Sequence, residues 1–488
     1  MSSTDHAKQP DGADQEVQDF QPSKPMSRFT RWFRSPMFNV IVVGLISFTQ
    51  PGIWNALNST GAGGQQEPYL VNGSNSLTFG IMVFGCSFFA VMANKIGLKT
   101  VLVIGTLGYA PYSASMYVNN RYGVEWFVLL GGATCGVAAS ALWAAEGAIA
   151  LGYADIKDRG KFTGIWLGLR ELGQLLGASI QLSLNAKNGQ RGKVGYTTYL
   201  VLIAIQCLGL PLALLISPPQ KVIHSDGRKI ADPTKNKAVM GEFRKWLKLL
   251  KKKQFYLLIP ILIGFNWNST YQGIYLTKYF SVRARTLGGL TSGIAASAAN
   301  MFWGWFYDLK CFSRPQLAKI TWAFFSVIML GLFAWQVANE KLYEDTVPKI
   351  TLDWTSPGFG RGFAVNVLFR FMNESHYMFV YWLMGTFFDD IETLTLGVGL
   401  VRSFESIGSC LAFGIGAIKV SPMVNLVVAF AMFAVCIPAT SWVVFLVPER
   451  PVDNTKTSPD HTSIEDNKVA NPVLVSTAAA ATDGPRST

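Results

Sequence analysis

The chain has 488 residues, of which half are hydrophobic and only 15% are charged, and its formal net charge is +12. Soluble chains carry about 25% charged residues, so this composition excludes an ordinary soluble protein and favours a membrane protein. The basic charge does not indicate nucleic-acid binding, because no soluble segment interleaves Lys and Arg with stacking aromatic residues. It is typical instead of loops that face anionic lipid.

Apolar tracts long enough to cross a bilayer as helices recur along the chain. Only closed helices or barrels hide their backbone polar groups from lipid, so the tracts predict an all-α polytopic membrane protein with twelve transmembrane helices. The predicted spans are 37–56, 75–93, 101–117, 126–151, 162–184, 198–216, 255–277, 287–306, 320–337, 363–387, 395–418 and 424–447.

The spans divide the chain into two bundles of six helices, residues 36–216 and 254–448. Residues 1–35 and 449–488 are polar, lack apolar periodicity and are predicted to be disordered cytosolic tails. The loop 217–253 contains apolar residues at helical spacing among lysines, which predicts an amphipathic helix on the inner leaflet. A helix that binds a partner such as calmodulin has the same pattern.

Lys and Arg residues predict the orientation. With both termini in the cytosol, about 28 of the 42 basic residues are cytosolic. The first outer loop, 57–74, has none, and it contains two sequons from which we expect glycosylation at Asn58 and Asn72. Either the plasma membrane or an endomembrane is compatible with this pattern.

The two bundles contain related segments. The sequence Thr49-Gln-Pro-Gly-Ile-Trp54 is similar to Thr270-Tyr-Gln-Gly-Ile-Tyr275, and Glu146 corresponds to Glu374. Residues 90–95 also resemble 304–309, so the offsets of the three matches are about 214 to 228 residues. Matches in the same order at nearly one offset predict two pseudo-symmetric six-helix halves.

The loop after the second span, Asn94-Lys95-Ile-Gly97-Leu-Lys, resembles the signature of the major facilitator superfamily, and Asp308 is its counterpart in the second half. The resemblance implies a latch of Asn94, Lys95, Gly97 and Asp308 that breaks and re-forms as the halves move. The match is partial, because Asn94 replaces the usual Asp.

Other motifs resemble the Unc-ninety-three-like branch of that superfamily, in particular its fungal members. They are 55–65, 141–147 (ALWAAEG) and 381–385 (YWLMG). The resemblance implies a twelve-helix fold with a central cavity. It does not imply a substrate, because the branch includes apparent transporters, a channel accessory subunit and trafficking chaperones.

Ionisable side chains at membrane depth are costly, so each is a functional candidate. Polar residues share one face on each of three predicted helices. These stripes are Arg170, Gln174 and Gln181; Arg370, Asn373, Glu374 and Tyr377; and Arg402, Glu405, Ser406 and Ser409.

The spans contain three arginines and four glutamates, so one carboxylate lacks a cationic partner. The glutamates are Glu146, Glu171, Glu374 and Glu405. Because desolvation favours the protonated form of such a group, the sequence predicts a proton-coupling site. The candidates are Glu146, Glu374, Glu405 and His376, with Glu374 and Glu146 first. Structural Arg–Glu locks are the alternative, and Glu146 could instead belong to a gate. His376 is more readily explained as a structural histidine.

Arginine binds anionic or carbonyl oxygens as a fork, so the stripes also supply candidates for solute binding. A second set lies on the first span of each half. The full set of substrate-binding candidates is Arg170, Gln174, Arg370, Arg402, Gln50, Trp54, Asn266, Gln272 and Tyr275. Trp54 has an equally good alternative as an anchor at the membrane interface.

The sequence contains no nucleophile–base arrangement, metal-ligand spacing or phosphate-binding loop, so we expect neither an enzyme nor a cofactor or metal site. The leading hypothesis is a secondary transporter of a small amphipathic or anionic organic solute by alternating access, with proton coupling. The rival hypothesis is a non-transporting membrane adaptor that regulates a channel or escorts another membrane protein.

Overall fold

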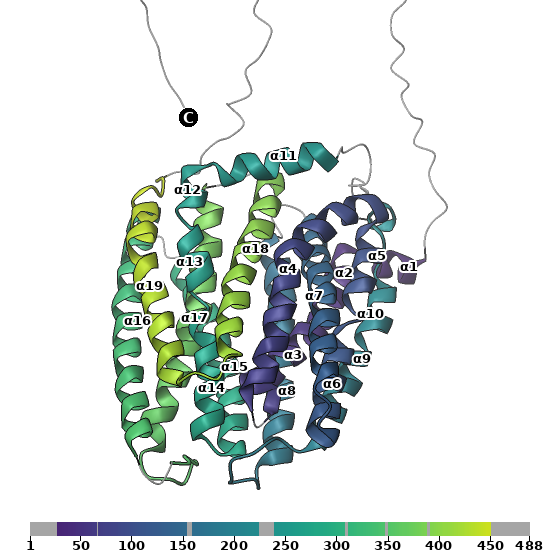
Figure 1. Cartoon of the computed structure of the whole chain (residues 1–488). Coiled ribbons are helices and arrows are strands. Elements are labelled where there is room, and N and C mark those ends of the chain that lie inside the picture. Colours follow the sequence, from purple (N-terminus) through teal and green to yellow (C-terminus); the bar gives the residue numbers. More distant parts are fainter. Residues whose placement is uncertain are drawn as a thin grey trace, which may run out of the picture. The chain divides into compact units, whose positions relative to one another are not determined.

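The computed structural model describes residues 27–65, 67–153, 159–223, 239–307, 311–346, 350–387 and 391–449. These residues form a helical bundle (Figure 1). Its helices are α1 (Arg28–Phe33), α2 (Pro36–Ser47), α3 (Ile53–Ser59), α4 (Pro68–Ile96), α5 (Leu98–Gly105), α6 (Tyr109–Tyr122), α7 (Trp126–Gly152), α8 (Arg159–Asn185), α9 (Tyr196–Cys207), α10 (Gly209–Leu215), α11 (Val239–Leu250), α12 (Lys253–Tyr256), α13 (Ile259–Gly264), α14 (Asn268–Tyr279), α15 (Val282–Tyr307), α16 (Arg314–Asp345), α17 (Phe359–Phe387), α18 (Ile391–Gly416) and α19 (Pro422–Phe445).

Each predicted span coincides with one long helix or with consecutive shorter ones, so the twelve-helix fold is confirmed. The first span is α2, a π-helical turn η1 (Phe48–Gly52) and α3. The third is α5 and α6, the sixth α9 and α10, and the seventh α12 to α14. Phe280 and Leu352 form an isolated parallel β-bridge.

The first span of each half is interrupted near its middle. Pro51 lies inside η1, where it cannot donate a backbone hydrogen bond, so the helix widens by a π turn. In the second half, the break between α13 and α14 falls at residues 265–267.

The packing of the helices has the predicted pseudo-symmetry. In the first half α4 packs on α7, α2 on α8 and α6 on α9; in the second half α15 packs on α17, α13 on α18 and α16 on α19. A shift of six spans converts one set into the other. Two of the pairs that join the halves, α4 with α18 and α8 with α15, are also exchanged by this shift.

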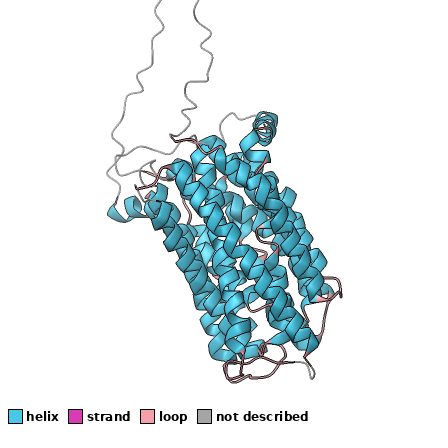
Figure 2. Cartoon of the chain, turned by 90° about the vertical axis from the view of Figure 1, so that its left-hand side faces the viewer, coloured by secondary structure: helices cyan, strands magenta, loops and turns pink. Residues whose placement is uncertain are grey.

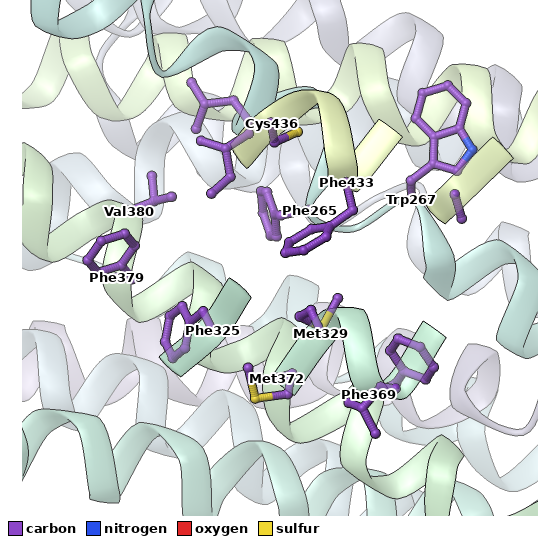
Figure 3. Close-up of a cluster of buried hydrophobic side chains, with 14 of the residues drawn as sticks. Phe265, Trp267, Phe325, Met329, Phe369, Met372, Phe379, Val380, Phe433 and Cys436 are labelled. Atoms are coloured by element: carbon purple, nitrogen blue, oxygen red, sulfur yellow. The ribbon is translucent and has the colours of Figure 1, made fainter. Parts of the chain in front are cut away.

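Aromatic and thioether side chains fill the interior of the second half. Figure 3 shows Phe265, Phe325, Phe369 and Phe433 around a common interior, with Met372 between helices. Lipid tails are as apolar as these side chains, so their close packing stabilises the half mainly through dispersion contacts.

Helix α11 lies in the loop between the two halves. It runs crosswise to the spans at one end of the bundle and is seen along its axis in Figure 2. Leu249 is buried where α11 packs on α18, and Arg244, Leu247 and Lys248 are exposed. Its membrane contact stays a prediction.

Seven of the spans are long and apolar enough to be recognised as membrane helices by composition among the described residues. The other five are α8, α12 to α14, α15, α17 and α18. The predicted polar stripes lie on three of these five, and α8, α15 and α18 also join the halves. The polar spans therefore bring the candidate residues to the interface between the halves.

Candidate functional site

Three ion pairs lie near the middle of three spans. Each joins an arginine to a glutamate of the same helix. The pairs are Arg170–Glu171 on α8 (2.5 Å), Arg370–Glu374 on α17 (2.7 Å) and Arg402–Glu405 on α18 (3.0 Å). The arginine side chains are 13%, 24% and 16% exposed, respectively, so solvent-accessible space reaches them at membrane depth.

These pairs belong to different halves and interact across the interface. Arg170 is on the first half, and its charge interacts with Glu374 and Arg402 of the second. The structure therefore brings the charged residues of the three predicted stripes together in one cluster. We call Arg170, Glu171, Arg370, Glu374, Arg402 and Glu405 the central cluster. It contains three positive and three negative side chains and is balanced in charge.

The Arg402 guanidinium lies in a cage of aromatic rings. Its Cζ atom is 4.1 Å from the centroid of the Trp143 ring, 5.6 Å from that of Tyr377 and 6.0 Å from that of Tyr381. The Tyr377 hydroxyl donates a hydrogen bond to Glu405, the ion-pair partner of Arg402. Since Trp143 is on α7, this cation–π contact joins the two halves.

Sequence reasoning did not select Trp143 as a site residue. The available signal was its position as the one large aromatic residue within the small-residue motif 141–147. Arg170 of the first half also approaches the same ring, at 5.8 Å from its centroid. Trp143 is thus shared by one arginine from each half.

Of the four glutamates in the predicted charge balance, Glu146 is the one without an ion-pair partner among the described residues. Its side chain is fully buried, and its Oε2 atom accepts hydrogen bonds from the Ser47 hydroxyl (2.6 Å) and the Trp166 indole N–H (3.1 Å). Its Oε1 atom is buried without a hydrogen-bond partner. The odd carboxylate of the predicted charge balance is therefore Glu146, whereas Glu374 and Glu405 are paired.

Several buried amides near the interface also lack partners. Both side-chain polar atoms of Gln174 and Gln272 are buried without a hydrogen bond within the described chain, as are Asn373 Oδ1 and Arg370 Nε. Buried polar groups in proteins are normally paired. These atoms therefore provide free donors and acceptors for water or a bound solute.

Other predicted residues lie away from the central cluster. Gln50 donates to the carbonyl of Gln206 (2.6 Å) inside the first half. Tyr275 donates to the carbonyl of Gly362 (3.1 Å), and Trp54 packs against Phe79 and Tyr112. Asn266 is half-buried on the turn between α13 and α14, and Gln181 donates to the Ala56 carbonyl (2.7 Å).

His376 lies in the interior of the second half. Its ring contacts Phe325 of α16, with centroids 4.6 Å apart, and Phe433 of α19, and its Nδ1 atom is 2.7 Å from the Met372 carbonyl oxygen. This position is that of a packed histidine and is separate from the central cluster.

The predicted latch stays a prediction. Asp308 and the side chain of Asn94 lie outside the described residues. Lys95 is exposed at the end of α4, and Gly97 has a φ of 89°, which explains the glycine at this turn.

The two predicted glycosylation sites are placed in packed positions. The Asn72 side chain is 4% exposed and donates to the carbonyl of Gly416 (2.9 Å). Asn58 Oδ1 accepts hydrogen bonds from Asn75 and Tyr112. A glycan on Asn72 would displace α18, so this conformation gives the predicted modification no support.

A cross-half latch that sequence reasoning missed lies at the end of the bundle carrying Thr60 and Asp353. We call this the outer end, following the predicted orientation. Arg285 of α15 is 1% exposed and donates four hydrogen bonds of 2.8 to 2.9 Å to backbone carbonyls of the first half. The acceptors are Thr60, Gly61, Gln65 and Gly192. Arg285 appeared in the sequence only as a basic loop residue before a span.

The neighbouring Arg283 strengthens the same end. Its guanidinium pairs with Asp353 and stacks on Trp354 at 4.6 Å, while its backbone N–H donates to the carbonyl of Asn188 in the first half. The Arg283 hydrogen bonds hold the pKa of the Asp353 carboxyl well below its usual range. This pair therefore stays ionised at every physiological pH.

Glu340 is a buried carboxylate, like Glu146, but sequence reasoning did not identify it. It accepts hydrogen bonds from the hydroxyls of Tyr271 (2.5 Å) and Tyr279 (2.7 Å), and Lys278 lies 3.6 Å away. Helix α16 continues beyond the predicted span 320–337, so Glu340 is part of a membrane helix and not of a loop.

Comparison with known proteins agrees with this architecture. The model of the Major Facilitator Superfamily matches residues 35–388. The notoamide biosynthesis cluster protein O' of Aspergillus versicolor is 33% identical over 419 residues, which cover 85% of this chain and 90% of that protein. UNC93-like protein 1 of Arabidopsis thaliana is 27% identical, with 87% and 93% covered. An UNC93-like protein of Schizosaccharomyces pombe is also 27% identical, with 80% and 78% covered.

Two solved structures share the fold. A D-xylose–proton symporter aligns with a TM-score of 0.59, covering 85% of this chain and 98% of that one. A nucleoside transporter aligns with a TM-score of 0.54, covering 85% and 99%. Both are 12% identical to this chain, so they show the fold alone. The chain belongs to the major facilitator superfamily, as a member of its UNC93-like branch.

Proposed function

We propose that this protein is a secondary transporter that moves a small organic solute by alternating access and couples that movement to a proton on Glu146. The central cluster carries the proposal. It gathers charged side chains from both halves at membrane depth, beside buried amides that have no partner in the described chain. A static bundle would gain nothing from leaving such groups unpaired.

The distribution of contacts between the halves supports a moving pair of bundles. Hydrogen bonds that join the halves lie toward the outer end, and their donors are Asn72, Ser76, Val282, Arg283 and Arg285. This conformation is closed at the outer end. Alternating access requires that these contacts break and that others form at the opposite end.

Of the two leading candidates for the proton site, Glu146 is preferred over Glu374. Glu374 is neutralised by Arg370, whereas Glu146 has only neutral donors and one unpartnered oxygen. A carboxylate in this setting changes charge at the lowest cost to its neighbours, because no ion pair has to open. We place both termini in the cytosol, as the distribution of basic residues predicts.

The test is proton movement in proteoliposomes challenged with a panel of anionic, cationic, zwitterionic and neutral organic solutes. We expect a solute-dependent proton flux that Glu146→Gln abolishes, because the glutamine keeps the shape of the side chain but cannot carry a proton. Glu125→Gln is the matched control, since Glu125 is exposed just before the same helix. It should keep the flux of the natural protein.

Two results would contradict the proposal. A full proton flux in the Glu146→Gln variant would remove Glu146 as the coupling site. No movement of any solute by well-folded protein, in either gradient direction, would remove transport itself and favour the adaptor. For the adaptor, function would survive loss of the central cluster, and co-purification of its membrane partner would be the next measurement.

A further inference from the structure

We infer that the transported solute is a zwitterion, with a cationic and an anionic group on one small skeleton. This inference rests on the proposed transport function and concerns the substrate class of the same site. Three features carry it: the aromatic cage around Arg402, the charge balance of the central cluster, and the buried amides without partners.

The cage is built to hold an organic cation. Trp143, Tyr377 and Tyr381 present three rings to one guanidinium, and Glu405 supplies the counter-charge. Aromatic rings around a carboxylate are the arrangement with which proteins bind ammonium ligands. In this conformation the cation is Arg402 itself, which is tethered to α18 and can leave the cage by rotation of its side chain.

The ion pair between Arg402 and Glu405 can open without leaving a buried charge only if two charges arrive together. An anionic group that draws Arg402 out of the cage leaves Glu405 unpaired. A cationic group that displaces Arg402 leaves the arginine unpaired. A zwitterion satisfies both, because its anion pairs with Arg402 while its cation takes the cage beside Glu405.

The other residues of the central cluster also favour a zwitterion over a singly charged solute. Glu171 and Glu374 already neutralise the arginines Arg170 and Arg370, so no net charge is available for a singly charged solute. Gln174 and Asn373 offer neutral donors and acceptors that orient a polar skeleton without changing this balance. Trp143 is contributed by the first half and the other cage residues by the second. Occupation of the cage by solute therefore changes the contact between the halves.

The experiment compares matched triads of probes with purified protein in nanodiscs. One triad is L-phenylalanine, 2-phenylethylamine and 3-phenylpropionate, and another is L-leucine, isopentylamine and 4-methylpentanoate. Binding is measured by equilibrium titration and by the shift of the thermal midpoint. We expect a zwitterion to bind at least about tenfold more tightly than both of its singly charged analogues, because each analogue leaves one buried charge unpaired.

A variant series tests the cage itself. Trp143→Leu should weaken zwitterion binding about tenfold or more, and Trp143→Phe should weaken it less, because phenylalanine keeps a smaller aromatic face. Trp126→Leu is the control, since Trp126 lies on the same helix and is 67% exposed. The triads need no variant, so they test the inference even if Trp143→Leu fails to fold.

Equal or tighter binding of a singly charged analogue, or no binding by any zwitterion of the triads, would overturn the inference. An unchanged affinity in Trp143→Leu would overturn the role of the cage. A Glu146-dependent proton flux driven by a simple anion or cation would refute the zwitterion while leaving the transport proposal intact. Zwitterion binding without solute movement would refute the transport proposal while leaving the ligand class of the site intact.

Discussion

At the residue scale, two neighbours on α7 have different surroundings. Trp143 and Glu146 are three positions apart, yet Trp143 contacts an arginine of the other half while Glu146 accepts hydrogen bonds from α2 and α8. One turn of this helix therefore contains both the cage wall and the proposed proton site. Trp166 links them, because its ring lies 6.2 Å from that of Trp143 and its N–H reaches Glu146.

Glu340 makes a prediction about stability and not about transport. Replacing it with alanine removes the acceptor of the Tyr271 and Tyr279 hydroxyls and the counter-charge of Lys278. Buried hydroxyls without a partner are destabilising, so we expect Glu340→Ala to lower the free energy of unfolding by about 1 to 3 kcal/mol. Thermal unfolding of the detergent-solubilised variant measures this change.

The neighbouring Glu344 provides the comparison for Glu340. Its side chain is 32% exposed and contacts Lys278 and Ser421 at the rim of the bundle. Glu344→Ala should change the thermal midpoint much less, because exposed charge pairs contribute little. Equal losses in the two variants would show that the Glu340 network is not a buried stabilising contact.

At the element scale, close approach of helices depends on glycines in the first half. Helix α8 passes the broken first span so closely that a Cβ atom at Gly173 would lie 2.3 Å from the Phe48 carbonyl oxygen. A Cβ at Gly177 would lie 2.7 Å from that of Ala56. The Gly173-x-x-x-Gly177 spacing thus serves close packing of helices.

Substitution of these glycines should separate the two helices. Gly173→Ala forces either α8 or η1 to move, because the obstructing atom belongs to the backbone, and overpacking of this kind costs about 1 to 3 kcal/mol. Gly168→Ala is the matched control, since a Cβ there meets nothing within 4 Å. Thermal unfolding should show a loss for Gly173→Ala and none for Gly168→Ala; the opposite order would contradict the packing role.

The sequence predicts elements better than it predicts contacts. All twelve predicted spans are found, because length and hydropathy act locally. The central cluster was predicted as a group, since arginine at membrane depth needs a partner. Glu340 was missed because helix α16 extends past its apolar stretch, and Arg285 because only tertiary packing shows what a rim arginine binds.

The choice among the glutamates also required the structure. Charge counting shows that one carboxylate is left over, but it does not show which one, because pairing depends on how side chains are directed within and between helices. Arg370 pairs with Glu374 one turn along α17, and this pairing removes Glu374 from first place. Gln50 shows the same limit, since a polar residue can face the interior of its own half.

At the scale of the whole molecule, the two halves are held together at one end. Arg285 of the second half is surrounded by four backbone carbonyls of the first and has no carboxylate partner among the described residues. Carbonyl oxygens bind a guanidinium more weakly than a carboxylate does, so this latch can close the outer end and still be broken in each transport cycle.

The last prediction concerns the opening of this latch. Arg285→Gln removes the guanidinium that donates four hydrogen bonds across the two halves, so we expect the outer ends to separate and the outward-open population to rise. Lys187 and Lys341 are exposed at the outer ends of the two halves. After the exposed Cys207 and Cys311 are replaced, spin labels at these two positions report the distance between the halves by pulsed electron resonance. Lys193→Gln at the same end is the control, because its bond to the Asn120 carbonyl stays within the first half. A longer distance in Arg285→Gln alone is the expected result. Unchanged distances in Arg285→Gln, with the protein folded, would mean that the helix pairs α4–α18 and α8–α15 close the outer end without this arginine.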